Sequence, residues 1–358
     1  MRYDKVCVES ISYTLPEEVV TTAEIESRLF PLYSRLRLPE GRLGLLTGIS
    51  ERRIWRAGTT PGQQSVVTVR KLLESSGIDP LFVGVLIHGS VCRDYLEPAT
   101  ACGVHNQLGL SEACLVYDVS NACLGLLSGV IQIANMIELG QVRAGIVVGT
   151  ESSRSLMEAT IQYLNTDQTI TRKSVKPAFA SLTIGSGSAA ILLVSEDISR
   201  TGNKLVGGAI RTRTKFCDLC RSNTDQTGGD AMNPLMDTDS EALLREGVAV
   251  AADVFDDFLG EVNWSVEDID RIFCHQVGKA HQQALFEKLN LPEELNFSTL
   301  EFLGNTGSVA LPITAGIGLE RGIVKAGSKI AMLGIGSGIN VIMLGMSYNQ
   351  MDISKNSL

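Results

Sequence analysis

The sequence predicts a layered α/β protein built from two similar halves. Short β-branched runs alternate with amphipathic stretches at intervals of about 30 residues, the size of one strand, crossover and strand unit. Both series end in a Gly-Ser-Gly turn that leads into an apolar strand, within 184–194 and 335–344. The chain of 358 residues holds 35 glycines and only 5% aromatic residues, so we expect small and aliphatic side chains to pack closely.

The expected elements follow from these runs in chain order. They are strands at 83–88, 115–119 and 144–149 with a helix at 128–139, and strands at 271–275, 297–300 and 329–333. A polar stretch at 199–204 suggests two domains, 1–200 and 201–358. The aperiodic segments 150–181 and 211–239 are expected to form caps or substrate-tunnel walls.

Charge and composition exclude several classes of function. The net charge is −9 and the isoelectric point is near 5.1, so the chain repels a phosphate backbone and no nucleic-acid partner is expected. Asp4 and Glu9 stand where a signal peptide needs an uninterrupted apolar stretch. The most apolar run, 330–346, is broken by glycines and polar residues. We therefore expect a cytoplasmic protein without a membrane span.

One of the eight cysteines has a context that suggests catalysis. Cys123 lies in the motif NACLG, directly after an apolar strand and before an apolar helix. A helix N-terminus lowers the pKa of a thiol and offers N–H groups that can hold an oxyanion. Position alone also leaves a structural role open. Cys217 and Cys220 form a C-x-x-C pair without a second pair of ligands, so no metal is expected, and their role stays open.

His275 and Asn305 are the expected partners of Cys123. His275 ends a strand, and Asn305 lies in GNTGS just after the next strand. If the halves are related by pseudo-symmetry, these strand ends meet the Cys123 strand end in the middle of the molecule. His88, His105 and His281 lack such glycine-rich surroundings and are interpreted as packing or surface residues.

Taken together, these motifs resemble the β-ketoacyl-ACP synthase III branch of the thiolase superfamily. The resemblance rests on NACLG, the HQ at His275, GNTGSVALP, the terminal GIGSG, and TGI at 47–49 followed by two arginines. It implies a thiolase-like fold, with two pseudo-symmetric βαβαβαββ halves in five αβαβα layers, and a homodimer. Within the branch, SVCRDYLEPAT at 90–100 is similar to the OleA-type thiolases of bacterial olefin biosynthesis. In those enzymes the glutamate of this motif, here Glu97, reaches into the neighbouring subunit's active site as the base.

The resemblance implies a non-decarboxylative Claisen condensation between two acyl-CoA molecules. Cys123 would carry the first acyl group, while the backbone N–H groups of Cys123 and Ser337 hold the oxyanion. Glu97 would remove the α-proton of the second substrate, and His275 and Asn305 would bind the enolate. The product would be a 2-alkyl-3-oxoacyl compound. No permanently bound cofactor is expected, because coenzyme A or acyl-carrier-protein thioesters enter as substrates.

Several alternatives stay open at this level. Leu46 and Gly278 stand where ordinary synthase III enzymes carry an arginine and an asparagine, so the usual coenzyme A contacts are not expected. A decarboxylating synthase III that uses malonyl-ACP is the nearest alternative. An acyltransferase acting on an oxygen or nitrogen nucleophile and a non-catalytic acyl-binding homologue are the others. Acyl chain length, carrier and pathway do not follow from the sequence.

Overall fold

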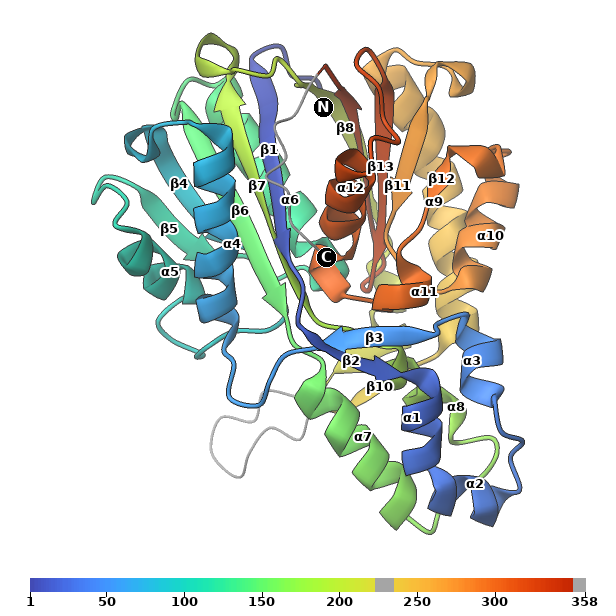
Figure 1. Cartoon of the computed structure of the whole chain (residues 1–358). Coiled ribbons are helices and arrows are strands. Elements are labelled where there is room, and N and C mark those ends of the chain that lie inside the picture. The colour runs from blue at the N-terminus through green and yellow to red at the C-terminus, as the bar shows by residue number, and fades with distance from the viewer. Residues whose placement is uncertain (223–234, 350–358) are drawn as a thin grey trace.

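A ten-stranded mixed sheet runs through the computed structural model, which describes residues 1–222 and 235–349 (Figure 1). The first half contributes β1 (Val6–Thr14), β4 (Val83–His88), β5 (Leu115–Asp118), β6 (Ala144–Glu151) and β7 (Gly187–Ser195). The second half contributes β8 (Lys204–Thr212), β11 (Arg271–Cys274), β12 (Asn296–Phe297), β13 (Lys329–Gly336) and β14 (Asn340–Ser347). The halves join where β1 and β8 pair at Cys7 and Lys204.

The two halves have the same topology. The spatial order is β5-β4-β6-β7-β1 in the first and β12-β11-β13-β14-β8 in the second, which is the order third, second, fourth, fifth, first in both. The pairs β4·β5 and β4·β6 are parallel, as are β11·β12 and β11·β13, while the remaining pairs within each half are antiparallel. The pseudo-symmetric α/β fold is therefore confirmed. The boundary after residue 200 stays a prediction, and it falls between β7 and β8.

The larger helices and the minor elements complete the chain. The helices are α1 (Thr22–Arg28), α2 (Phe30–Leu36), α3 (Arg42–Thr47), α4 (Pro61–Ser76), α5 (Thr100–Leu108), α6 (Gly125–Glu138), α7 (Arg154–Thr166), α8 (Lys176–Phe179), α9 (Ser240–Val262), α10 (Lys279–Lys288), α11 (Leu300–Leu303) and α12 (Ala310–Glu320). The short 3-10 turns are η1 (Pro80–Phe82), η2 (Ala122–Leu124), η3 (Ala180–Thr183), η4 (Glu196–Ile198), η5 (Thr214–Leu219), η6 (Val266–Asp268), η7 (Glu293–Leu295) and η8 (Gly307–Val309). Two small antiparallel sheets pair β2 (Glu18–Thr21) with β3 (Glu51–Ile54), and β9 (Cys220–Ser222) with β10 (Met236–Thr238).

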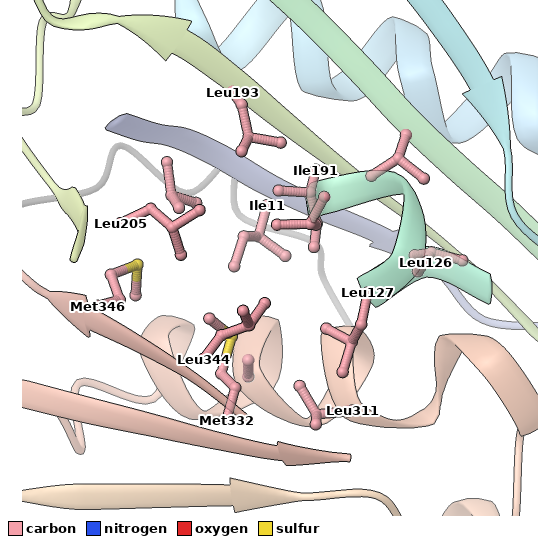
Figure 2. Packing of buried hydrophobic residues seen from close by; sticks show 14 of the residues in the cluster. Ile11, Leu126, Leu127, Ile191, Leu193, Leu205, Leu311, Met332, Leu344 and Met346 are labelled. Atoms are coloured by element: carbon pink, nitrogen blue, oxygen red, sulfur yellow. The ribbon is translucent and has the colours of Figure 1, made fainter. Parts of the chain in front are cut away.

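Period-two burial on the strands produces the layers. Along β7, Ile191 and Leu193 face the central helices α6 and α12, while Leu192 and Val194 face α4 and α5. The strands of the second half turn one face to the same central helices and the other to α9 and α10. Figure 2 shows the central cluster, where Leu127 of α6 and Leu311 of α12 meet side chains from both halves.

The aperiodic segment 150–181 forms α7, α8 and η3, which pack with α1–α3 as a cap below the sheet (Figure 1). Of the other aperiodic segment, 211–239, residues 223–234 lie outside the described residues. None of the helices in the two described ranges combines the length and the apolar character needed to cross a membrane.

One expected strand is shorter than the sequence indicates. The strand predicted at 297–300 contains only the last residue of β12, and Leu300 already begins α11. The buried side chain of Gln276 explains the difference. Its Oε1 accepts hydrogen bonds from Ser298 Oγ at 2.7 Å and from Thr299 N at 3.2 Å, so the backbone N–H of Thr299 is taken up by a side chain instead of a neighbouring strand.

Helix α6 begins earlier than predicted, at Gly125 rather than at residue 128. Gly125 packs against the backbone of Gly89, and a Cβ atom at Gly125 would lie 2.5 Å from Gly89 O. This close approach sets the start of the helix directly after the Cys123 turn.

Candidate active site

Cys123 lies in a tight strand-turn-helix connection. Strand β5 ends at Asp118, η2 holds Cys123, and α6 starts two residues later. Ala122, just before the cysteine, has φ of 43°, which an L-residue with a side chain rarely adopts. Such strain is stored where the surrounding structure forces it, and here it turns the chain so that the thiol stands at the N-terminal end of the central helix.

The pKa of the Cys123 thiol is raised to about 12, in contrast to the lowering expected from the helix N-terminus. Burial is the largest cause, and the charges of Glu151 and Cys220 add to it. Hydrogen bonding from the backbone N–H groups of Cys123 and Ser337 acts in the opposite direction. Desolvation outweighs the N–H groups, so the resting residue is a thiol whose proton must leave during attack.

A Gly-Ser-Gly turn from the second half lies against Cys123. A Cβ atom at Gly336 would be 3.6 Å from Cys123 Cβ, which places the turn in van der Waals contact with the cysteine. Asn340 Nδ2 donates to Asn121 Oδ1 at 3.0 Å and to Ser337 O at 3.1 Å. This Asn121–Asn340 bridge ties the Cys123 turn of one half to the Ser337 turn of the other.

His275 directly follows β11, and its backbone N–H donates to Leu333 O at 3.0 Å, next to the strand that leads to Ser337. Both of its ring nitrogens are buried without a hydrogen-bond partner among the described residues. Burial, and secondarily His281, lowers the pKa of His275 to about 4. The neutral ring therefore has one N–H to donate to a substrate oxygen at neutral pH.

Asn305 is held by its backbone against the loop before β7. Its N–H donates to Thr183 O and its carbonyl accepts from Gly185 N, each at 2.9 Å. Its Oδ1 accepts from Gly307 N at 2.9 Å, and in the described part of the chain nothing accepts from Nδ2. Because Oδ1 is occupied, the Nδ2 group is left to donate a hydrogen bond.

The Cys123 turn packs against β13 and against η8, the turn that follows Asn305. His275 is the residue after β11, the strand beside β13. Cys123 and His275 thus follow strands β5 and β11 of different halves, whereas Asn305 follows α11 and precedes η8, the turn that packs against the Cys123 turn.

Glu97 is exposed in the loop between β4 and α5. In the part of the chain that the structure describes, it forms no hydrogen bond or ion pair with Cys123, His275 or Asn305. The loop itself is anchored, since Asp94 accepts from Gly62 N at 2.8 Å and Thr100 Oγ1 accepts from Asp94 N at 3.2 Å. Glu97 is therefore an exposed carboxylate on an anchored loop.

A cleft of about 620 Å³ opens between α1, α3 and α10. Gly48 of the TGI motif and Lys279 line it, and so do Glu26 and Glu301. The two carboxylates offset the positive charge of the lysine.

Comparisons with known proteins fit this geometry. Residues 58–201 match the thiolase N-terminal domain, and residues 259–345 match the 3-oxoacyl-[acyl-carrier-protein (ACP)] synthase III C-terminal domain. An acyl-CoA:acyl-CoA alkyltransferase of Shewanella oneidensis is 40% identical over 351 residues, which are 97% of this chain and 100% of the relative. A protein of the same name from Xanthomonas campestris is 32% identical and covers 96% of this chain and 98% of its own. The chain belongs to the OleA-type family of thiolase-fold condensing enzymes.

Solved structures of OleA from Xanthomonas campestris support the same assignment. One superposes with a TM-score of 0.91 at 31% identity over 97% of this chain and 99% of its own. Another, of the same TM-score and identity, contains lauric acid and lauroyl-CoA and is covered over its full length, with 97% of this chain aligned. Variants of that enzyme replace a glutamate, a cysteine or a histidine.

Two residues near Cys123 and His275 were not predicted from the sequence of this OleA-type chain. Glu151 ends β6 and is buried beside the Asn305 turn, and its charge contributes to the raised pKa of Cys123. Its position at the carboxyl end of a strand was the signal that could have found it. His281, interpreted as a packing or surface residue, lies close enough to lower the pKa of His275. His88 is fully buried, as expected for a packing residue.

Proposed function

We propose that this chain joins two acyl-CoA molecules by a non-decarboxylative Claisen condensation through an acyl group on Cys123. The main support is that the thiol, the Ser337 turn and the Asn305 turn gather in a chain 40% identical to an acyl-CoA:acyl-CoA alkyltransferase. Lauroyl-CoA in a solved relative supports coenzyme A as the acyl carrier and a saturated acyl chain as substrate.

In the first step, Cys123 Sγ attacks the thioester carbon of the first acyl-CoA. The backbone N–H groups of Cys123 and Ser337 hold the oxyanion, and coenzyme A leaves as a thiol with the proton that the cysteine gives up. Because burial raises the pKa of Cys123 to about 12, proton loss accompanies attack rather than preceding it.

In the second step, Glu97 of the partner subunit removes the α-proton of the second acyl-CoA. His275 and Asn305 donate hydrogen bonds to the thioester oxygen of the resulting enolate. The enolate carbon attacks the acyl-cysteine carbonyl, the carbon–sulfur bond breaks, and the Cys123 thiolate regains the proton held by Glu97. The product is a 2-alkyl-3-oxoacyl thioester.

We propose that the working unit is a homodimer, because the exposed Glu97 needs a neighbour to reach a cysteine. Exposed apolar side chains beside it, Val91, Tyr95 and Leu96, together with Leu115 on edge strand β5, supply apolar surface for such a contact. The cytoplasmic location stays a prediction from the sequence.

In the deciding experiment, the purified protein is incubated with lauroyl-CoA as the sole substrate. We expect release of coenzyme A and a 3-oxo product detected by mass spectrometry. A product that forms only when malonyl-CoA or malonyl-ACP is added would favour the decarboxylating alternative. Transfer to an added alcohol or amine would favour the acyltransferase, and absence of acyl transfer would favour an acyl-binding homologue.

The roles of Cys123 and Glu97 are tested by mixing variants. Cys123→Ala should lose covalent acylation, whereas Glu97→Ala should acylate normally and not condense. After random subunit exchange of the two variants, half of the dimers are mixed and each has one intact site, so about a quarter of wild-type activity should return. No recovery would contradict a base supplied across the dimer, and each variant exchanged with itself is the control.

A further inference from the structure

Glu151 is a buried carboxylate that the proposed mechanism does not use. Its side chain is 5% exposed and accepts four hydrogen bonds. Oε1 accepts from Ser308 Oγ at 2.6 Å, Ser308 N at 3.3 Å and Val91 N at 3.1 Å, and Oε2 accepts from Cys92 N at 3.3 Å. The four donors are neutral groups, so no cation cancels its charge within these bonds.

These bonds join two loops that otherwise belong to different parts of the site. Ser308 lies three residues after Asn305, on the turn that presents the enolate-binding amide. Val91 and Cys92 begin the loop that carries Glu97. The carboxylate thus contacts both the enolate-binding turn of its own subunit and the base of the loop that extends toward the partner.

The fit around Glu151 is tight. A Cβ atom at Gly307 would lie 3.1 Å from Glu151 Cγ, and Gly307 has φ of 58°, so the turn follows the carboxylate closely and needs glycine there. Burial deprives a carboxylate of its hydration, and the four charge-assisted hydrogen bonds to Glu151 offset that cost. If Glu151 served only to accept these hydrogen bonds, its side chain would not need a negative charge.

We propose that Glu151 is a positioning residue of the condensing site. It holds the Asn305 turn and the Glu97 loop in register and places a fixed negative charge beside Cys123. The roles of Asn305 and Glu97 in this inference rest on the proposed function, but the effect on Cys123 does not.

The charged and titratable groups around Glu151 and Cys123 determine what a pH experiment on Cys123 measures. Cys123 is affected by Glu151 from β6 and Cys220 from β9, and by the N–H groups of Cys123 and Ser337. Glu151 in turn faces Cys92 and His88, whose titration it also influences. The Glu151 carboxylate raises the pKa of the Cys92 thiol and of the Cys123 thiol. Removal of its charge should therefore make Cys123 more reactive.

Three variants separate charge from position. Glu151→Gln removes the charge and keeps the shape, Ser308→Ala removes one hydrogen bond and keeps the charge, and exposed Glu74→Gln on α4 is the matched control. The first readout is the pH profile of Cys123 alkylation by iodoacetamide, followed on the Cys123 peptide by mass spectrometry. The second is condensation of lauroyl-CoA.

For Glu151→Gln we expect alkylation at a given pH to rise about threefold or more, while condensation falls about tenfold. For Ser308→Ala we expect condensation to fall about fivefold and the alkylation profile to stay within about twofold of wild type. General destabilisation also exposes the buried thiol and raises alkylation, so opposite movement of the two readouts supports the proposal only where Glu151→Gln keeps the wild-type melting temperature.

The proposal is overturned if Glu151→Gln leaves both readouts within about twofold of wild type, or if alkylation rises and condensation falls only together with a loss of thermal stability. If Glu151→Gln does not fold, Glu151→Asp keeps the charge and shortens the reach, so condensation should fall with alkylation unchanged; equal condensation overturns the proposal. If wild-type protein makes no condensation product, the proposed function fails, and the alkylation profile still decides whether the Glu151 charge acts on Cys123.

Discussion

Removal of the Asn340 side chain tests how the two halves hold the oxyanion-binding turn. In Asn340→Ala the bonds to Asn121 Oδ1 and Ser337 O, at 3.0 and 3.1 Å, are both lost. At about 1 kcal/mol of net stability for each bond, we expect the free energy of unfolding to fall by about 2 kcal/mol. A full oxyanion donor is worth about 10²–10³ in rate, and the Ser337 N–H is loosened rather than removed, so acylation should slow about tenfold.

The assay is the burst of coenzyme A released in the first turnover, measured with a thiol reagent, beside urea unfolding. Asn340→Asp should lose more than Asn340→Ala, because its carboxylate faces two carbonyl oxygens. Exposed Asn106→Ala on α5 is the control and should leave both measurements unchanged. Acylation by Asn340→Ala at the wild-type rate would refute the view that this bridge places the turn.

Two further predictions concern stability. Burial lowers the pKa of His275 and of His281 to about 4, so on acidification the unfolded chain takes up protons first, and stability falls as pH drops from about 6.5 to 4. Between these pH values, His275→Gln should reduce the slope of unfolding free energy against pH by about 1.4 kcal/mol per pH unit, as measured by urea unfolding. An unchanged slope would contradict the lowered pKa of His275. Gly125→Ala should lower the melting temperature although alanine favours helices, because its Cβ would lie 2.5 Å from Gly89 O. Gly260→Ala on α9, which has open space around it, is the control and should raise the free energy of unfolding by about 0.5–1 kcal/mol. Equal effects of the two substitutions would show that the close contact between Gly125 and Gly89 does not disfavour a side chain at Gly125.

The sequence was sufficient for the fold because its strands are strongly patterned. The runs at 83–88 and 144–149 match β4 and the body of β6, since both faces of these strands are buried and a continuous apolar run identifies them. The prediction of a strand at 297–300 was wrong because the side chain of Gln276, which is distant in sequence, accepts the hydrogen bond of the Thr299 N–H. A local pattern does not contain that contact.

Cys123, His275 and Asn305 could be chosen from the sequence because a turn motif marks each of them, and their catalytic roles stay predictions. Glu151 has no such motif, and its neighbours in space, Ser308 and Val91, are distant in sequence. The pKa of Cys123 was expected in the wrong direction, because a sequence shows the helix N-terminus but not the depth of burial that outweighs it.

The two central helices have an electrostatic consequence. The turns η2 and η8, which precede α6 and α12, pack against each other, so both helices start at one place. Each N-terminus carries the equivalent of about half a positive charge in its free N–H groups, of which Glu151 takes up one at Ser308. Two like ends repel each other, and the Glu151 carboxylate offsets part of that repulsion permanently. In the proposed mechanism an oxyanion or enolate would offset the rest, so the duplicated fold would favour the additional negative charge that forms during the reaction.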